Sequence, residues 1–148
     1  MKMRSPFYSI SLVLAQFGCL GVIVLSGPLI PTSLLPLCLL VAGLALGLWA
    51  LFTMRLRRLS VFPDPLPHTE LVSSGPYRLI RHPMYTSLLL VTLGWILVLP
   101  VWWRWGFWFG LLIVLITKLT YEEQLLQSRF ADYQTYQQRT WRLFPWIW

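Results

Sequence analysis

Four apolar runs, separated by short polar or proline-containing segments, set the pattern of this chain. The first covers residues 7–27 without a charged side chain, and the second covers residues 34–54. Both match the roughly 20 residues that a helix needs to cross the hydrocarbon core of a bilayer. The third, residues 84–100, is near the short limit of about 17 residues, and the fourth, residues 106–117, must extend beyond these bounds to span. The pattern predicts about four transmembrane helices.

The composition also indicates an integral membrane protein. Of the 148 residues, 57% are hydrophobic and 11% are charged, a balance far from that of a soluble domain. The apolar core of the first run is longer than that of a secretory signal, so we expect a retained helix. We expect one membrane domain with three parts: an N-terminal transmembrane hairpin at 1–54, a cytoplasmic loop at 55–83, and a C-terminal hairpin with a following helix at 84–148.

Basic residues are divided unevenly between the two sides of the predicted bundle. Of the 12 Lys and Arg residues, only Arg104 falls between the third and fourth runs. The others precede the first run, lie between the second and third, or follow the fourth, so the positive-inside rule places both termini in the cytoplasm. The net charge of +7 then arises from positions that face anionic lipid. Nucleic-acid binding is therefore not expected.

Small residues inside the apolar runs predict helix packing and no metal chemistry. Gly43 and Gly47 have the small-xxx-small spacing that lets a neighbouring helix approach closely. Cys19 and Cys38 each lie inside an apolar run with no His or Cys nearby to complete a metal site. We therefore expect both cysteines to be packing residues.

Beyond the fourth run, apolar side chains recur at helical spacing: Leu119, Leu126, Phe130 and Tyr133. Polar side chains fall off that face: Glu123, Gln127, Gln134 and Gln138. This periodicity predicts a C-terminal amphipathic helix that leaves the membrane and follows its cytoplasmic surface.

The strongest chemical signal is Arg81-His82 directly before Pro83, at the start of the third run. Proline is favoured in the first turn of a helix, so this pair is expected at a helix N-terminus. Amide groups there favour an anion, and a fixed guanidinium adds a bidentate clamp for a carboxylate or phosphate. In the alternative interpretation, Arg81 only reaches lipid headgroups and His82 only caps the turn.

The second signal is the pair Glu122-Glu123, just after the fourth run. Adjacent carboxylates disfavour each other's ionisation unless a cation lies nearby. Solvation of both groups on a surface helix is the alternative. Because the third and fourth runs form a hairpin, the glutamates should meet Arg81 and His82 on one side of the bilayer. The sequence therefore predicts a site with one cationic and one anionic wall.

Five motifs occur in order between residues 71 and 145: Leu71-Val72-x-Ser74-Gly75-Pro76-Tyr77, Arg81-His82-Pro83-Met84-Tyr85, Glu122-Glu123-x-Leu125, Phe130-x-x-Tyr133-x-x-Tyr136, and Arg139-Thr140 with Arg142 and Pro145. Together they resemble the isoprenylcysteine carboxyl methyltransferase and phospholipid methyltransferase superfamily of integral membrane enzymes. Two positions depart from the usual pattern, since Ser87 and Ala131 stand where glycine is common.

This resemblance implies an all-α membrane bundle whose C-terminal half binds S-adenosyl-L-methionine near the cytoplasmic surface, with a lipophilic or lipidated acceptor entering from the bilayer. By the same resemblance Arg81 and Glu123 would be catalytic. The cofactor would be bound by Tyr77, His82, Pro83, Tyr85, Glu122 and Glu123. Three further residues would shape or close the site: Tyr133, Tyr136 and Arg142.

The acceptor is left open by the residues. A carboxylate of a prenylated or isoprenoid-like substrate is already a nucleophile, and Arg81 would position it. A phospholipid amine must lose a proton, which would make His82 or one of the two glutamates a general base. Two other functions are conceivable: an NADPH-dependent membrane reductase of the sterol-reductase type, which the Glu122-Glu123 pair disfavours, and a non-enzymatic scaffold whose charges touch only headgroups. The sequence does not indicate an oligomeric state.

Overall fold

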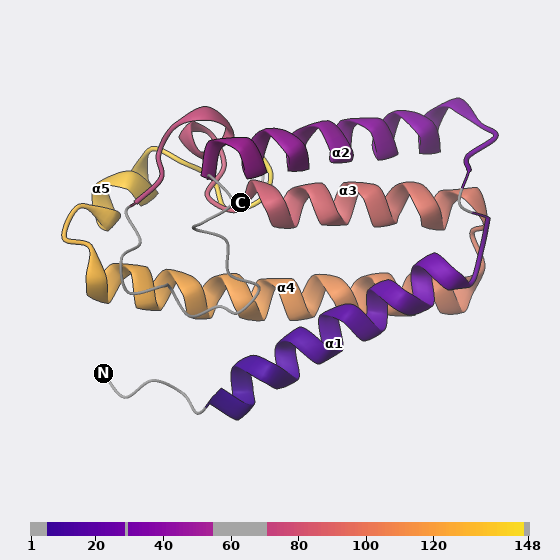
Figure 1. Ribbon diagram of the computed structural model, residues 1–148, viewed down its shortest axis with the longest axis horizontal. Helices are drawn as coiled ribbons and strands as arrows, with labels where there is room; N and C mark the ends of the chain where they lie inside the picture. Colours follow the sequence, from indigo (N-terminus) through magenta and orange to yellow (C-terminus); the bar gives the residue numbers. More distant parts are fainter. Residues whose placement is uncertain (1–5, 29, 55–70, 147–148) are drawn as a thin grey trace.

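The computed structural model describes residues 6–28, 30–54 and 71–146, and all regular secondary structure in these ranges is helical. Four long helices alternate in direction (Figure 1): α1 (Pro6–Leu25), α2 (Leu34–Met54), α3 (Pro83–Val98) and α4 (Trp102–Arg129). Two short helices, η2 (Gly75–Arg78) and α5 (Tyr133–Gln138), lie at the end where α3 begins and α4 ends, which we call the site end. The predicted all-α class is confirmed.

Among the described residues, two helices are long and apolar enough to span a membrane. These spans cover Phe7–Leu25 and Leu34–Met54, with mean hydropathies of 2.0 and 2.4. Helix α3 has 16 residues, so it is about 24 Å long and shorter than a typical hydrocarbon core. Helix α4 has 28 residues and carries charged side chains near both ends. Membrane crossing by α3 and α4, and hence the count of four spans, stays a prediction.

The two predicted hairpins are pairs of consecutive antiparallel helices, and the most extensive contacts link one pair to the other. Helix α2 packs most extensively against α3, whereas α1 packs mainly against α4. In Figure 1, α1 is inclined to the other three long helices and crosses α4, and it also contacts α3. Residues 1–54 thus contain two consecutive antiparallel helices whose main contacts are with the C-terminal half. The predicted cytoplasmic loop is described only from Leu71 onward.

Close approach of α2 to α3 depends on glycine. A Cβ atom on Gly43 would lie 2.9 Å from the backbone nitrogen of Val91 and 3.0 Å from the carbonyl oxygen of Ser87. The Ser87 hydroxyl donates a hydrogen bond of 2.7 Å to the Gly43 carbonyl oxygen. The close contact predicted from the small residues is thus confirmed, and the serine that departs from the family pattern makes an interhelical hydrogen bond.

Arg104 links the ends of α1 and α3 by hydrogen bonds, at the end of the bundle opposite the site end. Its side chain is 1% exposed, although we predicted it only as the lone cation of the outer side. It donates to the carbonyl oxygens of Ile23 at 2.9 Å and Leu99 at 2.8 Å, and to the Ser26 hydroxyl at 3.1 Å. The guanidinium therefore satisfies carbonyl groups that the ends of α1 and α3 leave without helical partners.

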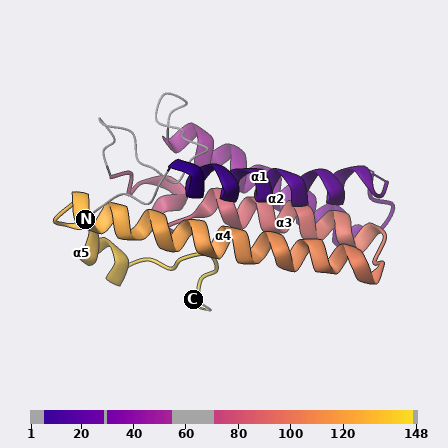
Figure 2. The same cartoon turned by 90° about the horizontal axis from the view of Figure 1, so that it is seen from below.

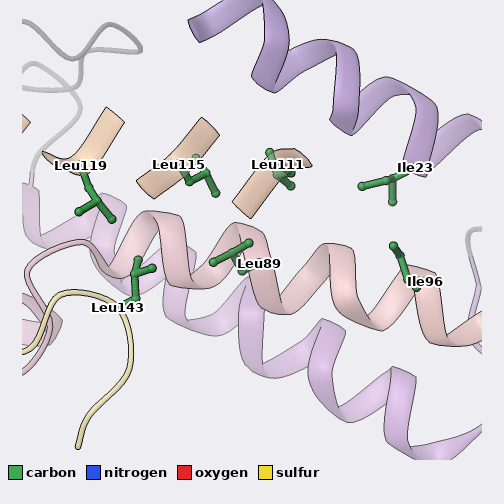
Figure 3. Packing of buried hydrophobic residues seen from close by; sticks show 7 residues of the cluster. All are labelled: Ile23, Leu89, Ile96, Leu111, Leu115, Leu119 and Leu143. Atoms are coloured by element: carbon green, nitrogen blue, oxygen red, sulfur yellow. The ribbon is translucent and has the colours of Figure 1, made fainter. Parts of the chain in front are cut away.

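The apolar core lies where α1, α3 and α4 meet (Figure 3). Its residues are Ile23, Leu89, Ile96, Leu111, Leu115, Leu119 and Leu143. Leu111, Leu115 and Leu119 follow one face of α4, whereas Leu143 belongs to the C-terminal tail beyond α5. The tail is thus held against the bundle by burial of an apolar side chain as well as by polar contacts.

The predicted amphipathic helix is divided in two. Helix α4 ends at Arg129, Phe130 has extended backbone angles, and α5 begins only at Tyr133 (Figure 2). Leu119 and Tyr133 are buried and the three glutamines are exposed, as the periodicity predicted, but Glu123 is buried. The prediction of one continuous helix was wrong. The chain reverses direction at 130–132, which brings residues 137–143 back to the site end.

We predict that Gly43→Ala destabilises the bundle by about 1–3 kcal/mol, because the added methyl group meets α3 backbone atoms that cannot move independently. Gly18→Ala is the matched control, since nothing lies within 4 Å of a Cβ at that position. Equilibrium unfolding of both variants in detergent micelles measures the difference, and equal stabilities would refute the proposed role of this contact.

Candidate functional site

The start of α3 is fixed by the returning tail. Pro83 opens the helix and His82 is its N-cap residue, as the Arg81-His82-Pro83 motif predicted. The Arg81 amide donates to the Trp141 carbonyl oxygen at 2.7 Å, and the His82 amide donates to the Arg142 carbonyl oxygen at 3.1 Å. The sequence predicts that amides at this N-terminus bind an anion. The amides of Arg81 and His82 instead donate to carbonyl oxygens of the C-terminal tail beyond α5.

The buried carboxylate of Glu123 lies at the centre of the site. Arg81 Nε donates to Oε1 at 2.7 Å, Arg142 Nε donates to Oε2 at 3.0 Å, and His82 Nε2 lies 3.3 Å from Oε1. The Gln137 side-chain amide adds a longer contact of 3.4 Å to Oε2. The predicted meeting of cations and anions at one end of the bundle is present in the structure.

Arg81 also binds the tail directly. Its Nη1 donates to the Gln137 carbonyl oxygen at 2.9 Å and to both the carbonyl and hydroxyl oxygens of Thr140. A guanidinium with Nε on a carboxylate and Nη1 on backbone carbonyls is held in one orientation. Arg81 therefore joins α3, α4 and the tail into one unit.

Glu122 has a different environment from its neighbour. The Tyr85 hydroxyl donates to Glu122 Oε1, and His82 Nδ1 lies 3.5 Å from Oε2. His82 thus lies between the two carboxylates, and the Tyr85 ring stacks on it with the centroids 5.5 Å apart. The Glu122 side chain is 20% exposed, compared with 3% for Glu123.

The two carboxyl groups, both beyond the predicted fourth span, have opposite pKa shifts. Burial raises the pKa of Glu122, and nearby His82 and Tyr85 offset this only in part. Burial also acts to raise the pKa of Glu123, but the hydrogen bonds and charges of His82 and Arg81 outweigh it and lower the pKa to about 2. Glu123 is therefore an ionised member of a salt-bridge network, whereas Glu122 takes up a proton more readily.

The tyrosines predicted to line or close the site surround this network. Tyr77, in η2, donates to the Met54 sulfur at 3.8 Å, and its carbonyl oxygen accepts a hydrogen bond of 2.7 Å from the Tyr136 hydroxyl. Burial is the main cause that raises the pKa of Tyr136 to about 12, so this hydroxyl keeps its proton at neutral pH. Tyr133, the first residue of α5, is 1% exposed. These residues support the walls of the site.

Four residues near the site were given no role in it from the sequence, although Thr140 belongs to one of the five motifs: Gln16, Lys118, Gln137 and Thr140. Gln137 and Thr140 could not be found from helical periodicity, because the chain reverses before α5. Lys118 did give a signal, since a charged side chain at the edge of an apolar run is expensive to bury and is a candidate for function. It is 1% exposed and its Nζ donates to Gln16 Oε1 at 2.8 Å.

The chain thus belongs to the class of small helical membrane proteins, and it has a buried ionic site at one end of its bundle. A family model described as phospholipid methyltransferase matches residues 31–133, so the chain belongs to this family. The resemblance inferred from the motifs is confirmed. The family supports a membrane methyltransferase and offers no support for the reductase alternative. No protein with curated annotation matches the chain. The matched range contains Arg81, His82, Glu122 and Glu123, but ends before the tail.

We predict that Glu123→Gln destabilises the protein by about 3 kcal/mol, because it leaves buried Arg81 without an anion. Gln124→Ala, at the exposed neighbouring position, is the control. Unfolding in detergent compares the two variants. A Glu123→Gln protein as stable as the control would show that the network does not hold the site end together.

Glu123 should also give the protein a characteristic acid sensitivity. Its folded-state pKa of about 2 lies below the ordinary value of 4.5, so its stabilising contribution is complete above 4.5 and is lost as the pH falls toward 2. The melting temperature of the native protein should therefore fall more steeply over this interval than that of Glu123→Gln. Parallel curves for the two proteins would contradict this assignment.

Proposed function

We propose that this protein transfers a methyl group from S-adenosyl-L-methionine to a lipophilic acceptor that resides in the membrane. The observation that carries the proposal is the buried cluster of Arg81, His82, Glu122 and Glu123 inside the range matched by the family. The helices suited to a membrane support an acceptor that approaches from lipid.

The donor set suits S-adenosyl-L-methionine, which carries a sulfonium, an amino group and a carboxylate. Glu122 is the more exposed of the two carboxyl groups, so we assign it to the cationic part of the cofactor. The stacked rings of His82 and Tyr85 offer an aromatic face beside it. Tyr77 and Pro83 support this wall from η2 and from the first turn of α3. When bound, the cofactor supplies a methyl group on positively charged sulfur.

The geometry favours positioning roles for Arg81 and Glu123, which the family resemblance made catalytic. Their charged groups are paired with each other at 2.7 Å, and Arg81 Nη1 is occupied by the tail. We propose that this pair holds His82 and Glu122 in place, so that reacting groups meet in a fixed orientation. Alignment of this kind accounts for a large part of the rate of a displacement reaction.

An amine acceptor fits the site better than a carboxylate acceptor. S-adenosyl-L-methionine, bound beside Glu122, would supply the methyl group, and the acceptor would need a free lone pair to receive it. A protonated amine must first give up a proton, and a carboxyl group with a raised pKa is suited to receive it. We assign this role to Glu122, which in its ionised form lies beside both the cofactor cation and the incoming amine and takes the proton of the amine before the methyl group is transferred. A carboxylate acceptor would instead meet the negative charge of Glu122.

We further propose that the site end faces the cytoplasm, with both termini on that side. The start of α1 and the end of α4 lie at the same end of the bundle (Figure 1). Arg78, Arg81, Arg129 and Arg142 also belong to that end, which agrees with the positive-inside rule.

We predict that purified native protein binds S-adenosylhomocysteine and S-adenosyl-L-methionine, and that Glu122→Gln weakens the latter about tenfold or more, because a charge-assisted contact is lost. Gln124→Ala should bind as the native protein does. Isothermal titration calorimetry in detergent provides the measurement, with NADPH as the comparison ligand. Binding of NADPH without binding of either adenosyl compound would replace the proposal with the reductase alternative.

The acceptor can be identified by incubating native protein in lipid vesicles with isotopically labelled methyl donor and analysing the extract by mass spectrometry. Label on an amine headgroup is the expected result. Label on a carboxyl group would transfer the acceptor assignment to an isoprenoid-like acid, and a Glu122→Gln variant with unchanged turnover would remove Glu122 as the base.

A further inference from the structure

Buried polar side chains lie at the contact between α1 and α4, next to the site. We call this contact the polar seam. Helix α1 buries one residue in every two turns on the face toward α4, namely Ser9, Gln16 and Ile23. Ile23 belongs to the apolar core, whereas Ser9 and Gln16 are polar. Opposite them on α4 lies Lys118. Polar and charged groups at such positions are costly within a membrane and are retained where they serve a function.

Lys118 connects this seam to the site. Its ammonium group donates to Gln16 at 2.8 Å and lies 5.4 Å from the centre of the Tyr85 ring. The hydroxyl of that same tyrosine donates to Glu122. Lys118 precedes Glu122 by four residues on α4, so the two are on neighbouring turns, separated by a rise of about 6 Å. The Gln16 side chain is neutral, and Glu122 is a carboxyl group that acts electrostatically on Lys118.

The order of these groups along α4 matches the order of groups in an aminophospholipid. Glu122 lies toward the site end, and Lys118 lies one turn deeper in the bundle. In a lipid of the adjacent leaflet, the amine is outermost, the phosphate lies about two carbon atoms deeper, and the acyl chains follow. We propose that Lys118, oriented by Gln16, binds the phosphate of the acceptor lipid and so places its amine beside Glu122. This inference rests on the proposed methyl transfer to an amine.

The packing of the helices indicates where such a lipid enters. Helices α2 and α3 are held together by the glycine contacts, whereas α1 is inclined to α4 and diverges from it toward the site end (Figure 1). Long side chains span the widening separation there, through the Gln16–Lys118 hydrogen bond and the edge contact of Tyr8 with Tyr121 at 5.9 Å. Rotation of these side chains would open the seam, and none of them belongs to the apolar core.

The alternative role for Lys118 is to balance the charge of Glu122, and the two roles predict different results. A phosphate-binding lysine determines which lipid is bound, whereas a counter-charge alters the cofactor site. The test uses full-length protein in detergent and three probes: dihexanoylphosphatidylethanolamine, dihexanoylglycerol, which lacks the phosphate, and S-adenosylhomocysteine. Affinities are measured by calorimetry for the native chain, Lys118→Gln, Lys118→Arg and the control Arg129→Gln.

We expect native protein to bind the phospholipid at least about tenfold more tightly than the diacylglycerol, because a charge-assisted phosphate contact is made only with the former. Lys118→Gln should abolish this preference and leave S-adenosylhomocysteine affinity within about twofold of native. Lys118→Arg should retain most of the preference. Arg129→Gln, which removes an exposed cation from the same helix, should behave as native.

The proposal is overturned if native protein shows no preference for the phospholipid, or if Lys118→Gln keeps that preference. Parallel loss of phospholipid and S-adenosylhomocysteine binding in Lys118→Gln also overturns it, in favour of the counter-charge role. A failure of the proposed methyl transfer gives a different result. In that case native protein binds the phospholipid through Lys118 but binds neither adenosyl compound.

Discussion

The pairing of the Glu123 carboxylate with two arginines is the constraint on which the site end of this protein depends. A carboxylate that is 3% exposed must be matched by positive charge and hydrogen bonds, and Arg81 and Arg142 supply them from positions 42 residues before and 19 residues after it. Meeting this requirement brings the start of α3, the end of α4 and the tail together. The turn at 130–132 follows, because a straight helix would carry Arg142 away from Glu123.

Adjacent glutamates take different roles because their side chains enter different surroundings. Glu123 points into a set of donors that keeps it ionised, and its charge is used in holding the structure together. Glu122 shares His82 with it but otherwise contacts a tyrosine hydroxyl, and burial raises its pKa. In the proposed transfer to an amine, this division leaves Glu123 to fix the geometry and Glu122 to exchange a proton.

The two principal helix contacts differ in a way that suits a membrane-resident acceptor. Glycine lets α2 approach α3 until the backbones touch, and the Ser87 hydroxyl reinforces that contact. Between α1 and α4, the apolar contact at Ile23 gives way to Gln16 and Lys118 nearer the site. The α1–α4 contact thus includes long polar side chains that can change rotamer, whereas the α2–α3 backbones touch, and the proposed entry of a lipid headgroup uses the former contact.

The sequence by itself determined the helical class, the close contact at Gly43 and the residues of the ionic cluster, because apolar run length, small-residue spacing and the short Arg81-His82 and Glu122-Glu123 motifs are local properties. It could not determine that α1 pairs with α4, that Arg104 is buried under the ends of two helices, or that the tail returns to occupy Arg81. Those features depend on contacts between residues far apart in the chain. For the same reason only the tertiary structure distinguished Glu122 from Glu123, since neighbouring residues of one type acquire different pKa values only from the groups that folding places around them.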